Sequence, residues 1–189
     1  MILVKLNLTG ASVSYLNNLN HPDQSEFWRS SKPHLRFVLK MHQATSLHYD
    51  FRLELDGVLL SWVLRQPPRF DPKWRLRAIP VDDHALVGLL TERRIPKGRY
   101  GAGPMLIADH GTYAPAPCSN VSHEKQVRDQ LRHGRLTFRL YGVRHQGLWC
   151  LYKEADRWFF QKGDDDFASK VQPYWDGRSV ISGKALEQI

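Results

Sequence analysis

Three ionisable side chains occupy alternate positions of one short segment: His48, Asp50 and Arg52. Successive side chains of a β-strand point to opposite faces, so these three would project together from one face. His42 lies just before the segment and can fold back toward them. Two imidazoles and one carboxylate with open positions suit a divalent transition metal, such as Mn²⁺ or Zn²⁺, that also holds water and a phosphate oxygen. The alternative is a surface histidine beside a solvated acid.

Arg52 and His84 extend this chemistry beyond the metal. Arg52 offers a fixed cation to an anionic substrate on the same face, and the alternative is a salt bridge to Asp50 or Glu54. His84 follows two aspartates at the end of a separate predicted strand. An imidazole there can donate a proton to a leaving oxygen, because histidine titrates near neutrality. A purely structural histidine is the alternative.

The elements that must position these residues are strands. Residues 47–55 alternate between apolar and polar side chains, and residues 58–64 form the predicted returning strand. The Asp56-Gly57 dipeptide between them favours a two-residue hairpin turn. The polar face is therefore expected on a hairpin, which is stiffer than a loop.

The rest of the chain also predicts short strands with little helix. One helix is expected over residues 122–133, capped by Ser122 and ended by Gly134. Residues 85–103 show few periodic signals, and their Gly-rich part, 95–103, is expected to be a structured loop with unusual dihedral angles. Residues 111–120 are expected to be a connection. Further strands are predicted over residues 36–41, 76–81, 105–109, 136–140, 148–152 and 158–161.

This pattern is typical of a mainly β protein. We expect a small closed or nearly closed antiparallel β-barrel of about eight strands, with one or two short helices. The predicted division is an N-terminal peripheral segment (1–34), a barrel domain (35–170) and a C-terminal tail (171–189).

The charge balance favours a polyanionic partner. There are 27 Lys and Arg against 19 Asp and Glu, a net charge of +8, and 17 of the basic residues are Arg, whose planar guanidinium matches phosphate oxygens. A solubilising surface charge is the alternative. Nucleic acid is preferred because nine basic residues fall in one segment with only four acids between them. They are Arg65, Arg69, Lys73, Arg75, Arg77, Arg93, Arg94, Lys97 and Arg99.

The cysteine count and the hydropathy indicate the compartment. Cys118 and Cys150 form neither a CxxC pair nor a secreted disulfide pattern. No stretch approaches the roughly 18 apolar residues of a membrane span. We therefore expect a cytoplasmic protein without membrane association.

Two long blocks carry a family resemblance. Residues 42–59 read His-x-Ala-Thr-x-Leu-His-Tyr-Asp-Phe-Arg-Leu-Glu-Leu-Asp-Gly-Val-Leu, and residues 95–103 read Ile-Pro-x-Gly-x-Tyr-Gly-Ala-Gly. Together with Ser61-Trp62 and Asp83-His84, they resemble the 3′-phosphoesterase domain of bacterial ATP-dependent DNA ligase D. The likeness extends over roughly residues 36–168, because Gly147-Leu148-Trp149 and residues 158–162 resemble its closing strands.

The resemblance implies a manganese-dependent β-barrel enzyme that trims DNA 3′ ends in non-homologous end joining. Such an enzyme removes terminal ribonucleosides and then the 3′-phosphate. By position, the metal ligands would be His42, His48 and Asp50, with Mn²⁺ expected and Zn²⁺ or Co²⁺ as alternatives. Arg52 would engage the phosphate, and His84 would act as general acid or contact the transition state.

Three positions depart from the family pattern. Gly88 stands where the family usually has a tyrosine, Gln66 replaces a lysine, and Leu76 replaces an arginine, although Arg75 and Arg77 flank it and are candidates for phosphate binding. Losing two or three charge-assisted contacts can cost several orders of magnitude in rate.

Three functions therefore compete. The first is a phosphoesterase on DNA or RNA-tipped 3′ ends, acting as a monomer with a separate ligase, polymerase and end-binding protein. The second is a catalytically weakened or inactive nucleic-acid-binding repair module with the same barrel. The third is a metal hydrolase for another phosphodiester.

Overall fold

The computed structural model describes residues 35–117 and 120–189. The predicted N-terminal peripheral segment, residues 1–34, lies outside these residues, and so does Cys118. Within the described ranges, no helix is long and apolar enough to cross a membrane.

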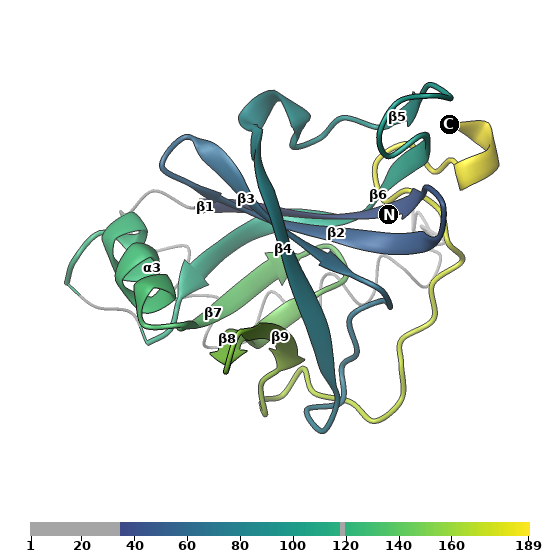
Figure 1. Ribbon diagram of the computed structural model, residues 1–189. Coiled ribbons are helices and arrows are strands. Elements are labelled where there is room, and N and C mark those ends of the chain that lie inside the picture. Colours follow the sequence, from purple (N-terminus) through teal and green to yellow (C-terminus); the bar gives the residue numbers. More distant parts are fainter. Residues whose placement is uncertain (1–34, 118–119) are drawn as a thin grey trace, which may run out of the picture. The chain divides into compact units, whose positions relative to one another are not determined.

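The described residues form a closed antiparallel barrel, as predicted (Figure 1). Eight strands follow one another around it in the order β1-β2-β3-β4-β9-β8-β7-β6, and β1 pairs with β6 to close the circle. A ninth strand, β5, adds to the free edge of β6. The strands are β1 (Leu35–Gln43), β2 (Leu47–Leu55), β3 (Val58–Leu64), β4 (Arg75–Ala85), β5 (Arg93–Ile95), β6 (Gly103–Pro115), β7 (Arg135–Gly142), β8 (Gln146–Glu154) and β9 (Arg157–Lys162).

Alternation along the strands fills the barrel with apolar side chains. Phe51 of β2 lies at the centre, where its ring packs against Phe160 at 4.6 Å between centroids and against Phe138 at 6.2 Å. Trp149 also stacks on Phe160, at 4.9 Å between centroids. All four rings are at most 1% exposed. The strands' other faces are therefore free to carry polar groups.

The hairpin that carries the predicted chemistry is formed as expected. Leu55 pairs with Val58 across a two-residue turn. Asp56 and Gly57 both have positive φ, 50° and 83°, as the favoured hairpin turn of this length requires.

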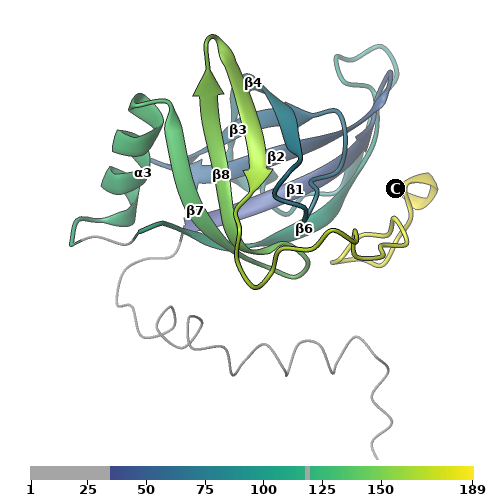
Figure 2. The ribbon, with the colours of Figure 1, turned by 90° about the horizontal axis from the view of Figure 1, so that it is seen from below.

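The helix α3 (His123–Arg132) also agrees with the prediction. The Ser122 side chain accepts a hydrogen bond from the Lys125 backbone N–H at 3.2 Å, and Gly134 follows with φ of 73°. Figure 2 shows α3 beside β7, at one side of the barrel. Two short 3₁₀ turns, Leu86–Gly88 and Leu186–Gln188, complete the helical structure of the described residues.

Two predictions about the connections were wrong. Residues 111–115 belong to strand β6, which continues to Pro115 because β7 pairs with this second half. The expected loop between residues 85 and 103 contains the short strand β5. Local sequence did not show either strand, because the second half of β6 is specified by β7, which follows the helix, and β5 is only three residues long.

The C-terminal segment, predicted to be a tail, packs on the outside of the barrel. The Val180 backbone N–H donates to the Ile107 carbonyl of β6 at 3.0 Å, and the Val180 side chain packs against a small apolar cluster on this outer face. The cluster consists of Val38, Leu59, Leu89 and Ile107. It gives the outer face of β1 and β3 a second, smaller core.

A buried aspartate anchors the turn between β7 and β8. Asp109 is 0% exposed, and its carboxylate accepts from the backbone N–H groups of His110, Arg144 and His145 and from Nδ1 of His145. Removing the carboxylate would leave these buried donors without an acceptor, which is costly.

We therefore expect Asp109→Ala to lower the free energy of unfolding by about 3 kcal/mol, measured by urea denaturation. The control is Asp156→Ala, because Asp156 is fully exposed in the turn after β8 and makes only a 3.7 Å ion pair with Lys153. An equal loss in the two variants would contradict the anchoring role.

Candidate metal centre and phosphate site

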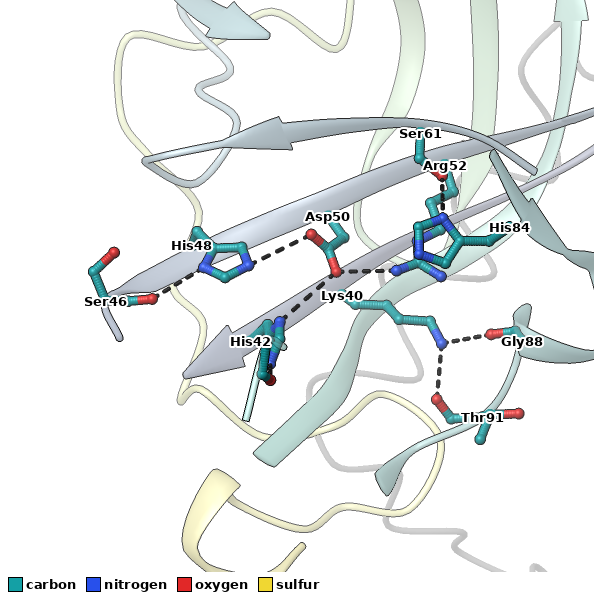
Figure 3. Close-up of polar contacts among 11 residues, drawn as sticks. Lys40, His42, Ser46, His48, Asp50, Arg52, Ser61, His84, Gly88 and Thr91 are labelled. Carbon is teal, nitrogen blue, oxygen red and sulfur yellow. Dashed lines mark hydrogen bonds and ion pairs between the residues drawn. The ribbon is translucent and has the colours of Figure 1, made fainter. Parts of the chain in front are cut away.

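Cross-strand register gathers the predicted site on the outer face of β1, β2 and β3 (Figure 3). His42 of β1 lies opposite His48 of β2, and Arg52 lies opposite Ser61 of β3. Directly opposed residues share a face and lie close together. Asp50, two residues from both His48 and Arg52, stands between them.

His42, His48 and Asp50 form a group of the right size for one metal ion. The candidate ligand atoms all lie within 4.8 Å of one another. The Asp50 carboxylate is 4.0 Å from Nδ1 of His42 and 3.6 Å from Nε2 of His48. The two imidazole rings lie 4.7 Å apart between centroids.

Backbone carbonyls orient both imidazoles. Nε2 of His42 lies 2.8 Å from the Gly101 carbonyl oxygen, and Nδ1 of His48 lies 3.0 Å from the Ser46 carbonyl oxygen. Because a carbonyl can only accept, each of these ring nitrogens carries the hydrogen. In the neutral rings, the nitrogens that face Asp50 then carry lone pairs. Such an outer hydrogen bond is typical of metal-ligating histidines.

Burial favours the neutral form of the His42 ring, which is the form that binds a cation. Desolvation lowers the pKa of His42 below its usual value of 6.5, and the Asp50 charge opposes this only in part. The ring is therefore neutral at pH 7, as a metal ligand must be. Two imidazoles and one carboxylate fit a divalent transition metal and leave coordination positions for water or substrate.

The predicted Gly-rich loop supplies the carbonyl that holds His42. Gly101 has φ of 72°, and a Cβ there would lie 3.4 Å from the His42 ring. At Gly103, with φ of 141°, a Cβ would lie only 1.8 Å from the Gln43 carbonyl oxygen. Only glycine allows this close approach. The expectation of unusual dihedral angles in this loop is confirmed.

Arg52 lies beside the metal group with hydrogen-bonding capacity to spare. Its Nη2 donates to Asp50 at 3.1 Å, which is the salt bridge expected as the alternative, while Glu54 instead pairs with Arg36 at 2.5 Å. Within residues 35–117 and 120–189, Nε of Arg52 is buried and has no hydrogen-bond partner. Burial lowers the pKa of this guanidinium. A phosphate oxygen would satisfy the unpaired donor.

A β-bulge brings His84 to the same face. Ser61 of β3 pairs with Val81, but Leu59 pairs with His84, so β4 contains one extra residue here. Without it His84 would point into the barrel, since one residue reverses the side-chain direction. Figure 3 shows the His84 ring beside the Arg52 guanidinium.

The hydrogen bonds of Ser61 determine which His84 nitrogen carries the proton. The Ser61 hydroxyl donates to the Leu59 carbonyl at 2.9 Å, so its oxygen accepts from Nδ1 of His84 at 3.0 Å. In the neutral ring Nε2 is then the basic nitrogen. Desolvation, and after it the positive charge of Arg52, lowers the pKa of His84.

Sequence reasoning missed Lys40. Its side chain is 2% exposed and lies opposite Asp50, and Nζ donates to the carbonyl oxygens of Gly88 at 2.5 Å and Thr91 at 2.8 Å. Burial lowers its pKa to about 8. The available signal was its position two residues before His42, on the same strand face.

The three departures from the family pattern lie in different places. Gly88 is over the site, where a Cβ would lie 3.9 Å from Nη1 of Arg52. Leu76 is buried at 8% exposure and Gln66 is exposed.

Arg75 and Arg77 are not brought together with the metal group. They lie at the start of β4, whereas His84 lies near its end. Arg75 pairs with Glu154 at 2.6 Å and lies over the Phe159 ring at 4.6 Å. Phosphate binding by these two arginines stays a prediction.

The lowered pKa of His42 gives a pH test. A proton competes with a metal ion for Nδ1, and a lowered pKa moves this competition to more acid pH. We expect Mn²⁺ affinity, measured by calorimetry, to be constant from about pH 8 to 7 and to fall below about pH 6. His133→Ala, at the end of α3, should leave the profile unchanged. A marked fall between pH 8 and 7 would contradict this account.

Comparison with known proteins identifies the family. Residues 40–153 match the family model described as the DNA ligase D 3′-phosphoesterase domain. The chain is 36% identical over 145 residues to the multifunctional non-homologous end joining protein LigD of Pseudomonas aeruginosa, covering 74% of this chain and 16% of that protein.

Two mycobacterial relatives show the same relationship. The multifunctional non-homologous end joining DNA repair protein LigD of Mycobacterium tuberculosis is 38% identical over 135 residues, covering 71% of this chain and 17% of that protein. For LigD of Mycolicibacterium smegmatis the identity is 36% over 141 residues, covering 74% and 18%. The chain thus spans less than a fifth of these relatives' length. Because the family model covers more than half of its 189 residues, the chain belongs to the DNA ligase D 3′-phosphoesterase domain family.

Proposed function

We propose that the chain is a Mn²⁺-dependent phosphoesterase that removes 3′-phosphates or 3′-ribonucleotides from DNA ends in non-homologous end joining. One observation carries this proposal. The oriented group of His42, His48 and Asp50 lies beside Arg52, a buried guanidinium with an unpaired donor. A metal site next to a fixed cation is suited to a phosphate ester.

Each side chain then has a chemical task. A divalent ion held by His42, His48 and Asp50 would supply Lewis-acid activation of the phosphate and of a water molecule. Arg52 binds a phosphate oxygen with its spare donor. Lys40 fixes the Gly88–Thr91 turn over the site.

His84 supplies the proton for the leaving oxygen. Because its pKa is lowered and Ser61 holds Nδ1, Nε2 must first take up a proton. A bound phosphate anion favours the protonated ring, so substrate binding itself prepares the general acid.

The partners follow from the substrate. The net charge of +8 and the exposed arginines of residues 65–99 suit the DNA backbone, and Arg75 and Arg77 are proposed duplex contacts away from the reacting end. A phosphoesterase only prepares ends, so joining requires a ligase, a polymerase and an end-binding protein. We propose that the chain acts on DNA as a monomer in the cytoplasm, with Zn²⁺ or Co²⁺ as alternative metals.

A second function is favoured by Gly88. The position that points toward Arg52 carries no side chain, so the phosphate shell has one group fewer than the family pattern. A nucleic-acid-binding repair module with weakened catalysis is therefore the alternative. It predicts salt-sensitive DNA binding that does not depend on the metal ligands.

The metal ligands give the direct test. Asp50→Asn should reduce Mn²⁺-dependent phosphate release from a 3′-phosphorylated primer–template by at least about a hundredfold, since even outer-shell changes at metal sites cost 10–100-fold. Asp56→Asn, in the exposed turn of the same hairpin, is the matched control and should retain activity. Equal rates in Asp50→Asn and the parent protein would rule out the phosphoesterase, whereas unchanged DNA binding without turnover in either would favour the second function.

Gly88 can be tested by adding the missing group. Gly88→Tyr places a hydroxyl near the phosphate site, and one additional hydrogen bond to a charged group should raise kcat/KM about tenfold. The control is Val87→Tyr, because Val87 is 86% exposed beside it. A drop in kcat/KM for Gly88→Tyr, or the same gain in both variants, would show that this position does not contact the phosphate.

A further inference from the structure

Two successive tight turns build the loop between β5 and β6. The Arg99 backbone N–H donates to the Pro96 carbonyl at 3.2 Å, and the Ala102 backbone N–H donates to the Arg99 carbonyl at 3.1 Å. The third residue of each turn is a glycine with positive φ, Gly98 at 83° and Gly101 at 72°. Type II turns require this conformation at this position. The loop is therefore a defined structure at the edge of the metal face.

The second turn places the backbone of an aromatic residue beside the metal group. Tyr100 precedes Gly101, whose carbonyl binds His42 at 2.8 Å, and adjacent Cα atoms are about 3.8 Å apart. Yet the Tyr100 side chain is fully exposed, at 101%. An aromatic side chain that is exposed to water and carried by a loop next to a reaction site is available to contact a ligand.

The neighbouring residues have the character of a nucleic-acid surface. Lys97 and Arg99 precede Tyr100 in the same loop and are exposed, as is Arg93 on β5. Across the site, Val87 and Leu90 are 86% and 51% exposed. Exposed cations beside exposed aromatic and apolar groups are the combination that binds single-stranded nucleic acid.

We propose that Tyr100 is the stacking platform for the base of the 3′-terminal nucleotide. This inference rests on the proposed function, because the reacting phosphate must lie at the metal group. That phosphate and the terminal base are attached to the same sugar, so the base must lie within one nucleotide of His42. Tyr100 is an exposed aromatic residue of the loop that contacts His42, and Lys97 and Arg99 of the same loop can receive the adjoining backbone phosphates.

Stacking on Tyr100 would recognise the presence of a base and not its identity. Every base has a π-face, so stacking requires a base without selecting one. Hydrogen-bond readout, in contrast, would separate the four bases. The chain should therefore accept all four 3′-terminal bases and should discriminate against an end that has none.

The test compares two DNA substrates and two variants of Tyr100. One substrate is a primer–template with a normal 3′-terminal nucleotide and a 3′-phosphate; the other carries a tetrahydrofuran abasic residue at that position. Tyr100→Ala should raise KM and the dissociation constant about tenfold for the normal end, as expected for one lost stacking contact, with no change for the abasic end. Tyr100→Phe should behave like the parent protein, because it retains the ring.

Binding is measured by fluorescence anisotropy in the parent and in the Asp50→Asn background, and turnover by phosphate release with Mn²⁺. Equal losses on both ends, or no loss on either, would overturn the stacking role. Absence of turnover in the parent protein would count against the phosphoesterase, whereas a base-dependent Tyr100 effect on binding would still support the platform.

Discussion

The register between β1 and β2 is the constraint on which the site depends. His42 faces His48, and Lys40 faces Asp50, only when the strands pair as they do. A shift by one residue would turn the ionisable groups into the barrel and Phe51 out of it. The aromatic core around Phe51 therefore specifies the metal group as well as the fold. The hairpin turn at Asp56 and Gly57 fixes the same register between β2 and β3.

The outer face of β1 and β3 is partly covered. The cluster of Val38, Leu59, Leu89 and Ile107 holds the 3₁₀ turn after β4 and the C-terminal segment against the strands. Beneath this cover Lys40 and Arg52 are 2% and 5% exposed. Charges with little access to water interact more strongly with one another and with a phosphate. By reducing the access of water, this cover strengthens the interaction of Lys40 and Arg52 with a bound phosphate.

Much of the fold and the centre of the site could be predicted from sequence because both rest on local periodicity. Alternation over residues 47–55 gave the strand, the hairpin and the shared face of His48, Asp50 and Arg52. The barrel class followed from the number of short strands. The family resemblance selected Mn²⁺ and the 3′ end, which periodicity could not.

The parts that could not be predicted depend on distant contacts. Lys40 acts on carbonyls near residue 90, and the bulge that redirects His84 exists only against Leu59 and Ser61. The length of β6 is set by β7, and the Gly101 carbonyl reaches His42 only after the loop folds back. Such pairings are properties of the assembled barrel, since no short window of sequence contains both partners.

Two carbonyl-oriented imidazoles and one carboxylate are proposed to form a metal site, and anomalous diffraction from crystals soaked in Mn²⁺ would locate the bound ion itself. We expect a single strong peak bonded to Nδ1 of His42, Nε2 of His48 and the Asp50 carboxylate, with the Gly101 and Ser46 carbonyls still holding the opposite nitrogens. A peak elsewhere, or no bound ion at saturating Mn²⁺, would show that these three residues do not form the metal site.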